Sequence, residues 1–386
     1  MAEYFRELFT PDRLFCPGPT PIPAEVVKAS TCQIYHRSEE FQKIFKSCCE
    51  DLRPLFGTKN PAVILTASGT GAMESVVVSL TSVQDEVLVV NGGKFGERWE
   101  KLVNVYQCRP TVVKVPWGEA PQPEELVRHL TPHTRAVFIQ ANETSTGAYY
   151  PVKEIARALR ASGYRGLIVV DAISSLGAHE MNMDAWDIDA VVAGSQKGFG
   201  LPPGLAFVAL SDRALASFTN RPKFYFDLAK EWKGQKEGRS AWTPAISLIH
   251  GLRETLNLMH QVGFDKILEQ HRRMAEGTRA AMEAMGLELF AKNCPSRALT
   301  SVKVPEGVDG VQWLKRVRRR FGMYVAGGQD ELKGKIIRFS HLGFISQFDV
   351  IDGIAALELA LAEEGSKIDI GHGVKTALGY WATNPW

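Results

Sequence analysis

Short apolar runs rich in β-branched residues alternate with helical stretches along the chain up to about residue 245. Seven of these runs predict strands, at residues 63–66, 86–91, 111–115, 136–140, 167–171, 190–193 and 206–210. Stretches with helical spacing lie between several of them, at residues 71–80, 123–130 and 152–161. Strands joined through helices form right-handed crossovers, so the pattern predicts an α/β fold. Its sheet is expected to be mainly parallel, with helices on both faces.

The pattern changes near residue 245, where long amphipathic stretches replace the alternation. Helices are predicted at 248–261, 267–285, 311–321 and 349–363, and strands at 300–304 and 336–339. This mixture predicts a smaller C-terminal α+β domain. Before the first strand, LFCPGPTPIP carries four prolines at 14–23, which exclude a helix or a central strand, so this stretch is predicted to be an extended arm or a loop. The predicted organisation is an arm at 1–22, a large domain at 23–245, a small domain at 246–364 and a tail at 365–386.

Composition excludes several functional classes. The 386 residues carry 45 Lys+Arg and 43 Asp+Glu, with no basic block, so nucleic acid and anionic membranes are not expected partners. No apolar run reaches the roughly 18–20 residues of a membrane span, and MAEYFRELFT lacks a signal-peptide core. The six cysteines form no C-x-x-C pair, and no metal-binding motif is present. These features predict a cytoplasmic protein with free thiols and no metal site.

Three features follow predicted strands, where ligands of parallel sheets gather. SGTGAMES at 68–75 is either a tight strand–helix turn or an anion site at a helix N-terminus. Asp171 ends the run LIVVD, where its carboxylate either caps the next turn or faces a ligand. Lys197 lies in GSQKGFGLPPG at 194–204; most lysines are solvated, but one held in a partly apolar pocket can form a Schiff base.

Together these features match the three functional groups of pyridoxal 5′-phosphate (PLP) that need a partner in the protein. That cofactor has a phosphate, a ring nitrogen that needs an anionic partner, and an aldehyde that needs an amine. The turn at 68–75, Asp171 and Lys197 would supply these three partners in turn. The sequence therefore predicts a PLP site at the carboxyl ends of the strands.

The ordered motifs resemble fold-type I PLP enzymes of the class V aminotransferase family, and most closely its alanine/serine–glyoxylate (–pyruvate) branch. The resemblance runs from about residue 14 to residue 363. Its motifs are PGPTPIP (17–23), HRSEEF (36–41), SGTGAMES (68–75), GGKFGER (92–98), NETSTG (142–147), VVDAISSLG (169–177), GSQKGFGLPPG (194–204), WTPAISLIHGLRE (242–254) and KIIRFSHLG (335–343). It implies a homodimer with a shared active site and a ping-pong transfer of an amino group from alanine or serine to glyoxylate or pyruvate.

The resemblance also implies a role for individual residues. Lys197 is the expected Schiff-base lysine and proton shuttle, and Asp171 the partner of the ring nitrogen. Arg338 is expected to bind the substrate carboxylate, with the backbone of Gly18 beside it. The remaining cofactor-binding residues are expected to be Thr70, Gly71, Ala72, Phe95, Thr144 and Gln196, with Ser240 and Thr243 supplied by the neighbouring subunit. Phe95 stands where relatives often have Trp, and Ala72 where some have His.

Three alternative functions differ from this one in the residues that they require. An aspartate or phosphoserine aminotransferase would need a second cation, for which Arg221, Lys223 and Arg239 are candidates. A PLP lyase such as a cysteine desulfurase would need a cysteine in the loop at 322–334, which has none. A non-catalytic binding protein on this scaffold is a third possibility, against which Lys197, Asp171 and Arg338 all argue.

Overall fold

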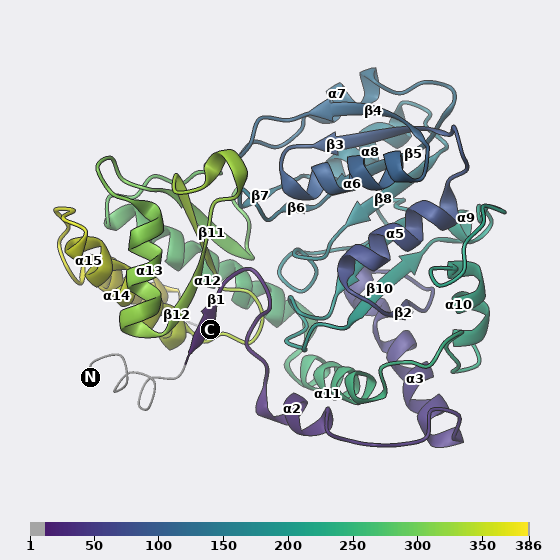
Figure 1. The fold of residues 1–386 in the computed structure, drawn as a ribbon, viewed down its shortest axis with the longest axis horizontal. Coiled ribbons are helices and arrows are strands. Elements are labelled where there is room, and N and C mark those ends of the chain that lie inside the picture. The colour runs from purple at the N-terminus through teal and green to yellow at the C-terminus, as the bar shows by residue number, and fades with distance from the viewer. Residues whose placement is uncertain (1–11, 385–386) are drawn as a thin grey trace.

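The computed structural model describes residues 12–384 and contains all seven strands predicted for the large domain (Figure 1). They form one sheet in the order β2-β10-β9-β8-β5-β3-β4. Their bounds are β2 Val63–Thr66, β3 Glu86–Asn91, β4 Arg109–Lys114, β5 Thr134–Gln140, β8 Leu167–Asp171, β9 Ala190–Gly194 and β10 Leu205–Leu210. The predicted mainly parallel sheet is confirmed: strand pairs from β4 to β9 are parallel, and β10 is antiparallel to both neighbours.

Helices cover both faces of this sheet because alternate residues of each strand point to opposite sides. In β3, Val87 and Val89 pack with helices α5 (Gly69–Leu80) and α6 (Lys94–Val105) on one face. Leu88 and Val90 pack on the other face, in the core that holds α3 (Glu39–Asp51), α8 (Val152–Ala161) and α11 (Ile246–Val262). Shorter elements complete this part: α2 (Ala24–Ala29), α4 (Arg53–Phe56), α7 (Pro123–Arg128), α9 (Asp212–Leu215), α10 (Leu228–Gln235), β6 (Asn142–Glu143) and β7 (Ala148–Tyr149).

The smaller α+β unit is also present, on the left of Figure 1. Its four-stranded sheet has the order β1-β12-β13-β11, with β1 Arg13–Phe15, β11 Leu299–Lys303, β12 Met323–Gly327 and β13 Ile336–Ser340. The helices are α12 Phe264–Ala284, α13 Gly310–Phe321, α14 Gln347–Glu363 and α15 His372–Thr383, with a short 3₁₀ helix at Asp330–Leu332. A separate apolar core around Trp313 and Phe339 holds them together.

Several local features differ from the sequence expectations. The stretch 322–334, expected to be a loop, contains strand β12 and the short 3₁₀ helix, because residues 326–327 pair with β13. Strand β4 begins at Arg109 and contains Pro110, which is tolerated because β4 is an edge strand. The arm contributes β1, which pairs in parallel with β12 at the edge of the small sheet, and the chain after it is extended. The tail forms helix α15, which packs on α12 as the indole of Trp381 donates to the carbonyl of Arg273. The domain boundaries at 22, 245 and 364 stay predictions.

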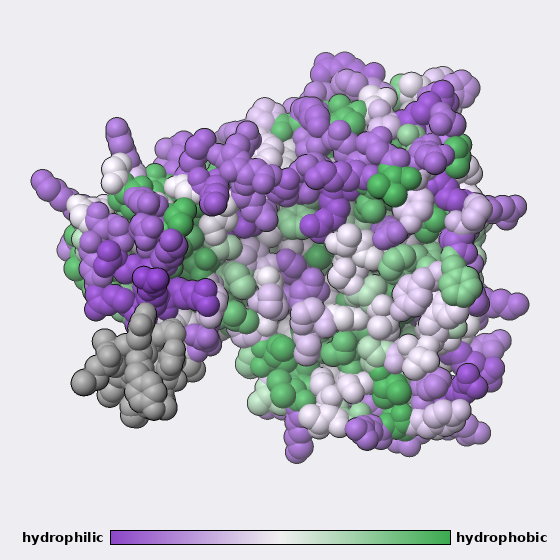
Figure 2. Space-filling view, in the orientation of Figure 1, coloured by the Kyte–Doolittle hydropathy of each residue, from purple (hydrophilic) through white to green (hydrophobic). Residues whose placement is uncertain are grey.

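No helix among residues 12–384 has both the length and the apolar composition needed to cross a membrane. Polar side chains cover much of the small unit in Figure 2, whereas apolar ones gather over α2 and α11 at the lower edge of that view.

Candidate active site

One edge of the large sheet carries most of the predicted site. Strands β3, β5, β8 and β9 run in the same direction, so the residues that follow their carboxyl ends share that edge. Strand β2 also ends there, because it and β9 are both antiparallel to β10. Five loops therefore meet at this edge, and they contain the sequence motifs around residues 68, 93, 143, 171 and 197.

Lys197 is buried, with 9% of its surface exposed, in the loop that follows β9. Its amine donates a hydrogen bond to the backbone carbonyl of Pro17 in the N-terminal arm. A Cβ atom built on Gly18 would lie 2.8 Å from the Lys197 Nζ, so a side chain there would displace the amine. Burial lowers the pKa of Lys197 to about 8, although the Asp171 carboxylate opposes the shift. A large fraction of this amine is therefore neutral near pH 8, as a nucleophile or base requires.

Asp171 ends β8 and is 3% exposed. Its Oδ1 accepts the N–H of Ile173 at 2.8 Å, so the carboxylate does cap the following turn. This single bond does not offset the loss of water, and burial raises the pKa of Asp171 to about 7. The charges of Arg98 and Lys197 favour the ionised form, but neither forms an ion pair with Asp171 within the described residues. The carboxylate therefore keeps acceptor capacity for a cationic partner, which the described residues do not supply.

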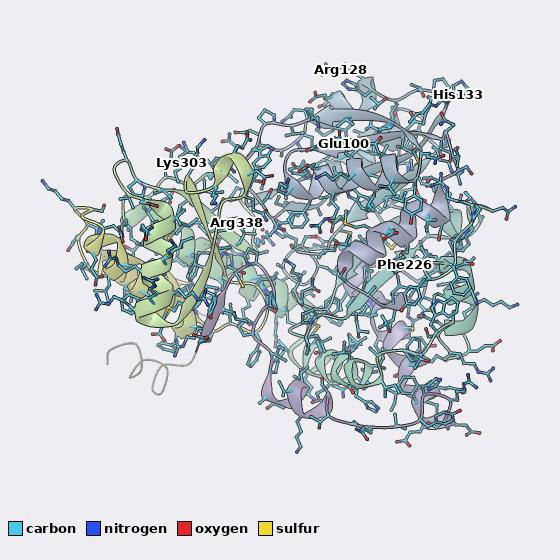
Figure 3. The ribbon with its side chains drawn as sticks, viewed as in Figure 1. Glu100, Arg128, His133, Phe226, Lys303 and Arg338 are labelled. Atoms are coloured by element: carbon cyan, nitrogen blue, oxygen red, sulfur yellow. The ribbon has the colours of Figure 1, made fainter. Side chains whose placement is uncertain are left out.

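Arg338 lies in β13 at the edge of the small unit that faces the large sheet (Figure 3). Its Nε and Nη2 donate to the carbonyl of Gly327 at 2.9 and 2.8 Å, and its Nη1 donates to the carbonyl of Thr144 at 2.9 Å. A guanidinium has five N–H groups, so one remains on each terminal nitrogen. Burial lowers the pKa of Arg338 to about 10, and the Glu143 carboxylate opposes that shift. A carboxylate that accepted both remaining N–H groups would compensate the buried charge.

Helices α5 and α6 meet at the same edge. The guanidinium of Arg98 donates to the Thr70 hydroxyl at 3.0 Å and lies over the Phe95 ring, 4.8 Å from its centroid. Phe95 is half-buried in the first turn of α6, while Gly71 and Ala72 are buried in the first turn of α5. Phe226 approaches that turn, since a Cβ atom on Gly71 would lie 3.0 Å from its ring (Figure 3). The N-terminus of α5 thus has the small residues and positive dipole that suit an anion.

Three buried side-chain amide oxygens at this edge have no partner among residues 12–384. They are the side-chain oxygens of Gln140, Asn142 and Gln196. The amide of Asn142 donates to the Thr144 hydroxyl at 3.3 Å, which places Thr144 in the same group. Buried polar atoms without partners are rare in native proteins, so their presence points to a polar ligand. Together with the unpaired carboxylate and the buried amine, they fit PLP.

The structure brings together Lys197, Asp171, Thr70, Gly71, Ala72, Phe95, Thr144, Gln196, Arg338 and Gly18, but it does not bring Ser240 or Thr243 to them within one chain. Ser240 instead donates to the buried carboxylate of Glu231 in α10 at 3.2 Å, and Thr243 is exposed. Their predicted contact is with the other subunit's cofactor, and it stays a prediction.

Sequence reasoning assigned no role to two charged residues at this edge. Arg98 ends the motif GGKFGER, three positions after Phe95 and therefore on the same face of the helix. Glu143 lies within NETSTG, beside the predicted Thr144, and is completely buried. The available signal for Glu143 was an acidic residue three positions after the end of a buried strand, since such a group needs donors.

The comparisons with known proteins identify the family of the chain. The family model described as Aminotransferase class-V matches residues 14–346. The chain is 39% identical to a protein named soluble hydrogenase, small subunit, from Synechococcus sp., over 94% of the chain and 97% of that protein. It is 32% identical to the serine–glyoxylate aminotransferase of Methylorubrum extorquens, over 97% of both.

Within residues 12–384, no three His, Cys, Asp or Glu side chains are grouped so as to hold a metal ion.

A solved structure gives the same fold. An aspartate aminotransferase of subgroup IV from Thermus thermophilus is 33% identical and superposes with a TM-score of 0.86, covering 91% of this chain and 99% of that one. A family match of this extent, with relatives of more than 30% identity across nearly their whole length, establishes the family. The chain belongs to the class-V aminotransferase family and is a transaminase whose cofactor is pyridoxal 5′-phosphate.

Proposed function

We propose that this transaminase moves the amino group of a small uncharged amino acid, alanine or serine, to glyoxylate or pyruvate. The observation that carries the proposal is the buried guanidinium of Arg338, which has free donors at the Lys197 edge of the sheet. The other guanidinium described at this edge, Arg98, donates to the Thr70 hydroxyl beside the N-terminus of α5, the expected phosphate site. One such cation binds one carboxylate, and a dicarboxylic or phosphorylated substrate would need another.

The contacts of the three candidates for a second cation lie elsewhere, although the side-chain nitrogens of Arg221 have no hydrogen-bond partner among residues 12–384. Arg221 lies over the ring of Tyr106, at the far end of α6 from Phe95 and about 16 Å along the helix axis at 1.5 Å per residue. Lys223 donates to the carbonyl of Thr219 at 2.7 Å. Arg239 is exposed and pairs with Glu237 at 3.8 Å. None of these contacts places a cation beside Arg338, which favours the small substrate over aspartate or phosphoserine.

The roles of the site residues follow from their positions. PLP supplies an aldehyde that takes up the amino group and a ring that accepts electrons. Lys197 would hold the cofactor, and its Nζ, with a pKa lowered to about 8, would accept the substrate α-proton and later return it. Asp171 would hold the charge of the ring nitrogen, and Arg338 would orient the substrate by its carboxylate. The residues that would hold the rest of the cofactor are Thr70, Gly71, Ala72, Phe95, Thr144 and Gln196.

A homodimer that shares the active site is part of the same proposal. Phe224 is 77% exposed and lies 4.8 Å from Trp242, ring to ring, beside the segment that contains Ser240 and Thr243. Exposed clustered aromatic side chains are typical of protein interfaces. Mixing Lys197→Ala chains with Thr243→Ala chains tests whether the two subunits share each active site. Restored activity supports the sharing, and a lack of restored activity with confirmed subunit exchange contradicts it.

A cytoplasmic location is likewise proposed, supported by six free cysteines.

The substrate proposal is tested by single-turnover experiments on the PLP-loaded enzyme without an oxo acid. The loss of the bound cofactor's visible absorbance is followed with alanine, serine, aspartate, glutamate and phosphoserine in turn, with D-alanine as the control. Alanine and serine are expected to react fastest. Faster reaction with aspartate, glutamate or phosphoserine would overturn the proposed substrate class, while leaving the transaminase itself intact.

A further inference from the structure

Glu143 is a buried carboxylate at the active-site edge that the proposed chemistry does not use. It ends β6 with 0% of its surface exposed. Its oxygens accept hydrogen bonds from the Ser145 hydroxyl at 2.6 Å and the Gln140 amide at 2.9 Å. They also accept the backbone N–H groups of Phe95 at 3.2 Å and Gly96 at 3.0 Å. Burial raises the pKa of Glu143, and these donors oppose that shift because they stabilise the ionised carboxylate.

Two of these donors belong to the first turn of α6, which has no cap of its own. Its N-cap residue is Gly93, and no side chain of that residue is available to accept the first N–H groups. Two side chains of a different loop take this role: the Ser145 hydroxyl accepts the N–H of Lys94 at 3.1 Å, and Glu143 accepts the next two and places a carboxylate at the positive end of the helix. The same turn carries Phe95, so this carboxylate fixes the backbone from which the ring projects.

The glycines of GGKFGER allow this close approach. A Cβ atom on Gly93 would lie 2.6 Å from the carboxyl carbon of Glu143 and 2.5 Å from the Ser145 hydroxyl. One on Gly96 would lie 2.8 Å from the Gln140 amide nitrogen. Real Cβ atoms do not approach so closely, so only glycine at these two positions lets Glu143 and Gln140 pack against the start of α6. The motifs GGKFGER and NETSTG are therefore in direct contact.

Glu143 is also connected to Arg338. The carbonyl of the next residue, Thr144, accepts the Arg338 Nη1 at 2.9 Å, so the position of Glu143 governs that acceptor. Its charge acts on the guanidinium as well: of the groups that keep the pKa of Arg338 from falling further, the Glu143 carboxylate contributes the most. The buried arginine has no ion-pair partner within 4 Å among the described residues, which makes this more distant charge its principal compensation.

We infer that Glu143 is a positioning residue that fixes both the Phe95 ring and the Arg338 guanidinium through one buried carboxylate. This inference rests on the proposed roles of those two residues. It predicts that Glu143 sets how strongly the enzyme distinguishes a substrate that has an α-carboxylate from one that lacks it. A residue that merely stabilised the fold would not change the ratio of kcat/KM between these two substrates.

The test compares Glu143→Gln with a matched control, Glu358→Gln. Glu358 is 1% exposed and accepts the N–H groups of Gly371 at 3.0 Å and Gly373 at 2.6 Å. It therefore caps α15, another helix with a glycine N-cap, but lies in the core of the small unit away from the sheet edge. Both substitutions keep the size of the side chain and remove one negative charge from a helix N-terminus.

Two quantities are measured for each protein. The first is the ratio of kcat/KM for alanine to kcat/KM for alaninamide, and the second is the dissociation constant of PLP from the apo protein by equilibrium dialysis. Glu143→Gln is expected to lower the ratio at least tenfold and to weaken PLP binding several-fold. Glu358→Gln is expected to leave both within twofold of the wild type, even where it lowers the unfolding midpoint.

An unchanged alanine-to-alaninamide ratio in Glu143→Gln would overturn the inference. If that variant does not fold, Ser145→Ala removes one donor to Glu143 and is expected to lower the ratio about threefold; an unchanged ratio there is equally decisive. A wild-type enzyme that uses both substrates equally well would overturn the role of Arg338, and this inference with it. Failure of the proposed function is thus distinguished from failure of the Glu143 role alone.

Discussion

The replacement Asp171→Asn should make the apo protein more stable near neutral pH. Asparagine has the same shape, and its Oδ1 can still accept the N–H of Ile173, a bond of 2.8 Å in the wild type. What it removes is a carboxylate whose pKa burial raises from 3.8 to about 7. The cost of ionising that group in the folded apo protein therefore disappears.

The magnitude and the sign follow from this shift. About three pKa units at 1.36 kcal/mol each correspond to about 4 kcal/mol. Because the folded-state pKa is raised, the folded protein binds the proton more tightly than the unfolded chain does. Stability is therefore lost as pH rises from about 4 to about 7, and the full cost is present at pH 8. Asp171→Asn lacks this loss.

Urea unfolding of the apo proteins at pH 4 to 8, at one protein concentration, tests the reasoning. The free energy of unfolding of Asp171→Asn minus that of the wild type should rise by about 4 kcal/mol between pH 4 and pH 8. Added PLP should stabilise the wild type more than the variant, since the cofactor's ring nitrogen supplies the missing cation. A difference between the two proteins that does not change with pH would refute the argument.

Three further predictions concern the other site residues. Arg338→Lys should lower kcat/KM for alanine about 100-fold, because an ammonium cannot form two parallel bonds to a carboxylate; a loss under threefold in steady-state kinetics would contradict the clamp. Phe95→Leu should weaken PLP binding about fivefold in dialysis, since it removes the stacking face, and unchanged affinity would exclude a stacking role. In the apo protein, acylation of Lys197 followed by mass spectrometry should increase with pH around an apparent pKa of about 8, because burial disfavours the charged amine; a rate that is still rising steeply at pH 10 would contradict this.

Much of the fold could be predicted because the strands of a buried parallel sheet leave a strong local signal. The run LIVVD is apolar on both faces and ends in an acid, and β8 has the bounds that this pattern predicts. Placing ligands at the carboxyl ends of such strands then brings Asp171 and Lys197 together without any knowledge of distances. Arg338 was found through the family resemblance, because an arginine in a short strand has no local signal of its role.

Other elements depend on contacts that the sequence does not reveal. Helix α6 begins after two glycines and contains Gly96, all of which argue locally against a helix; the carboxylate of Glu143 supplies the cap. Strand β1 pairs with β12, more than 300 residues away, and the proline-rich arm gives no sign of that partner. The helical tail exists because Trp381 packs against α12, which is a tertiary effect.

The most direct test of the account is the identity of the residue that bears the cofactor. The PLP-loaded protein is reduced with borohydride, digested, and mapped by mass spectrometry, with Lys197→Arg as the control. The account predicts that the pyridoxyl group is attached at Lys197 and that the control carries none. A label on another lysine, or an unlabelled Lys197 in fully loaded protein, would contradict it.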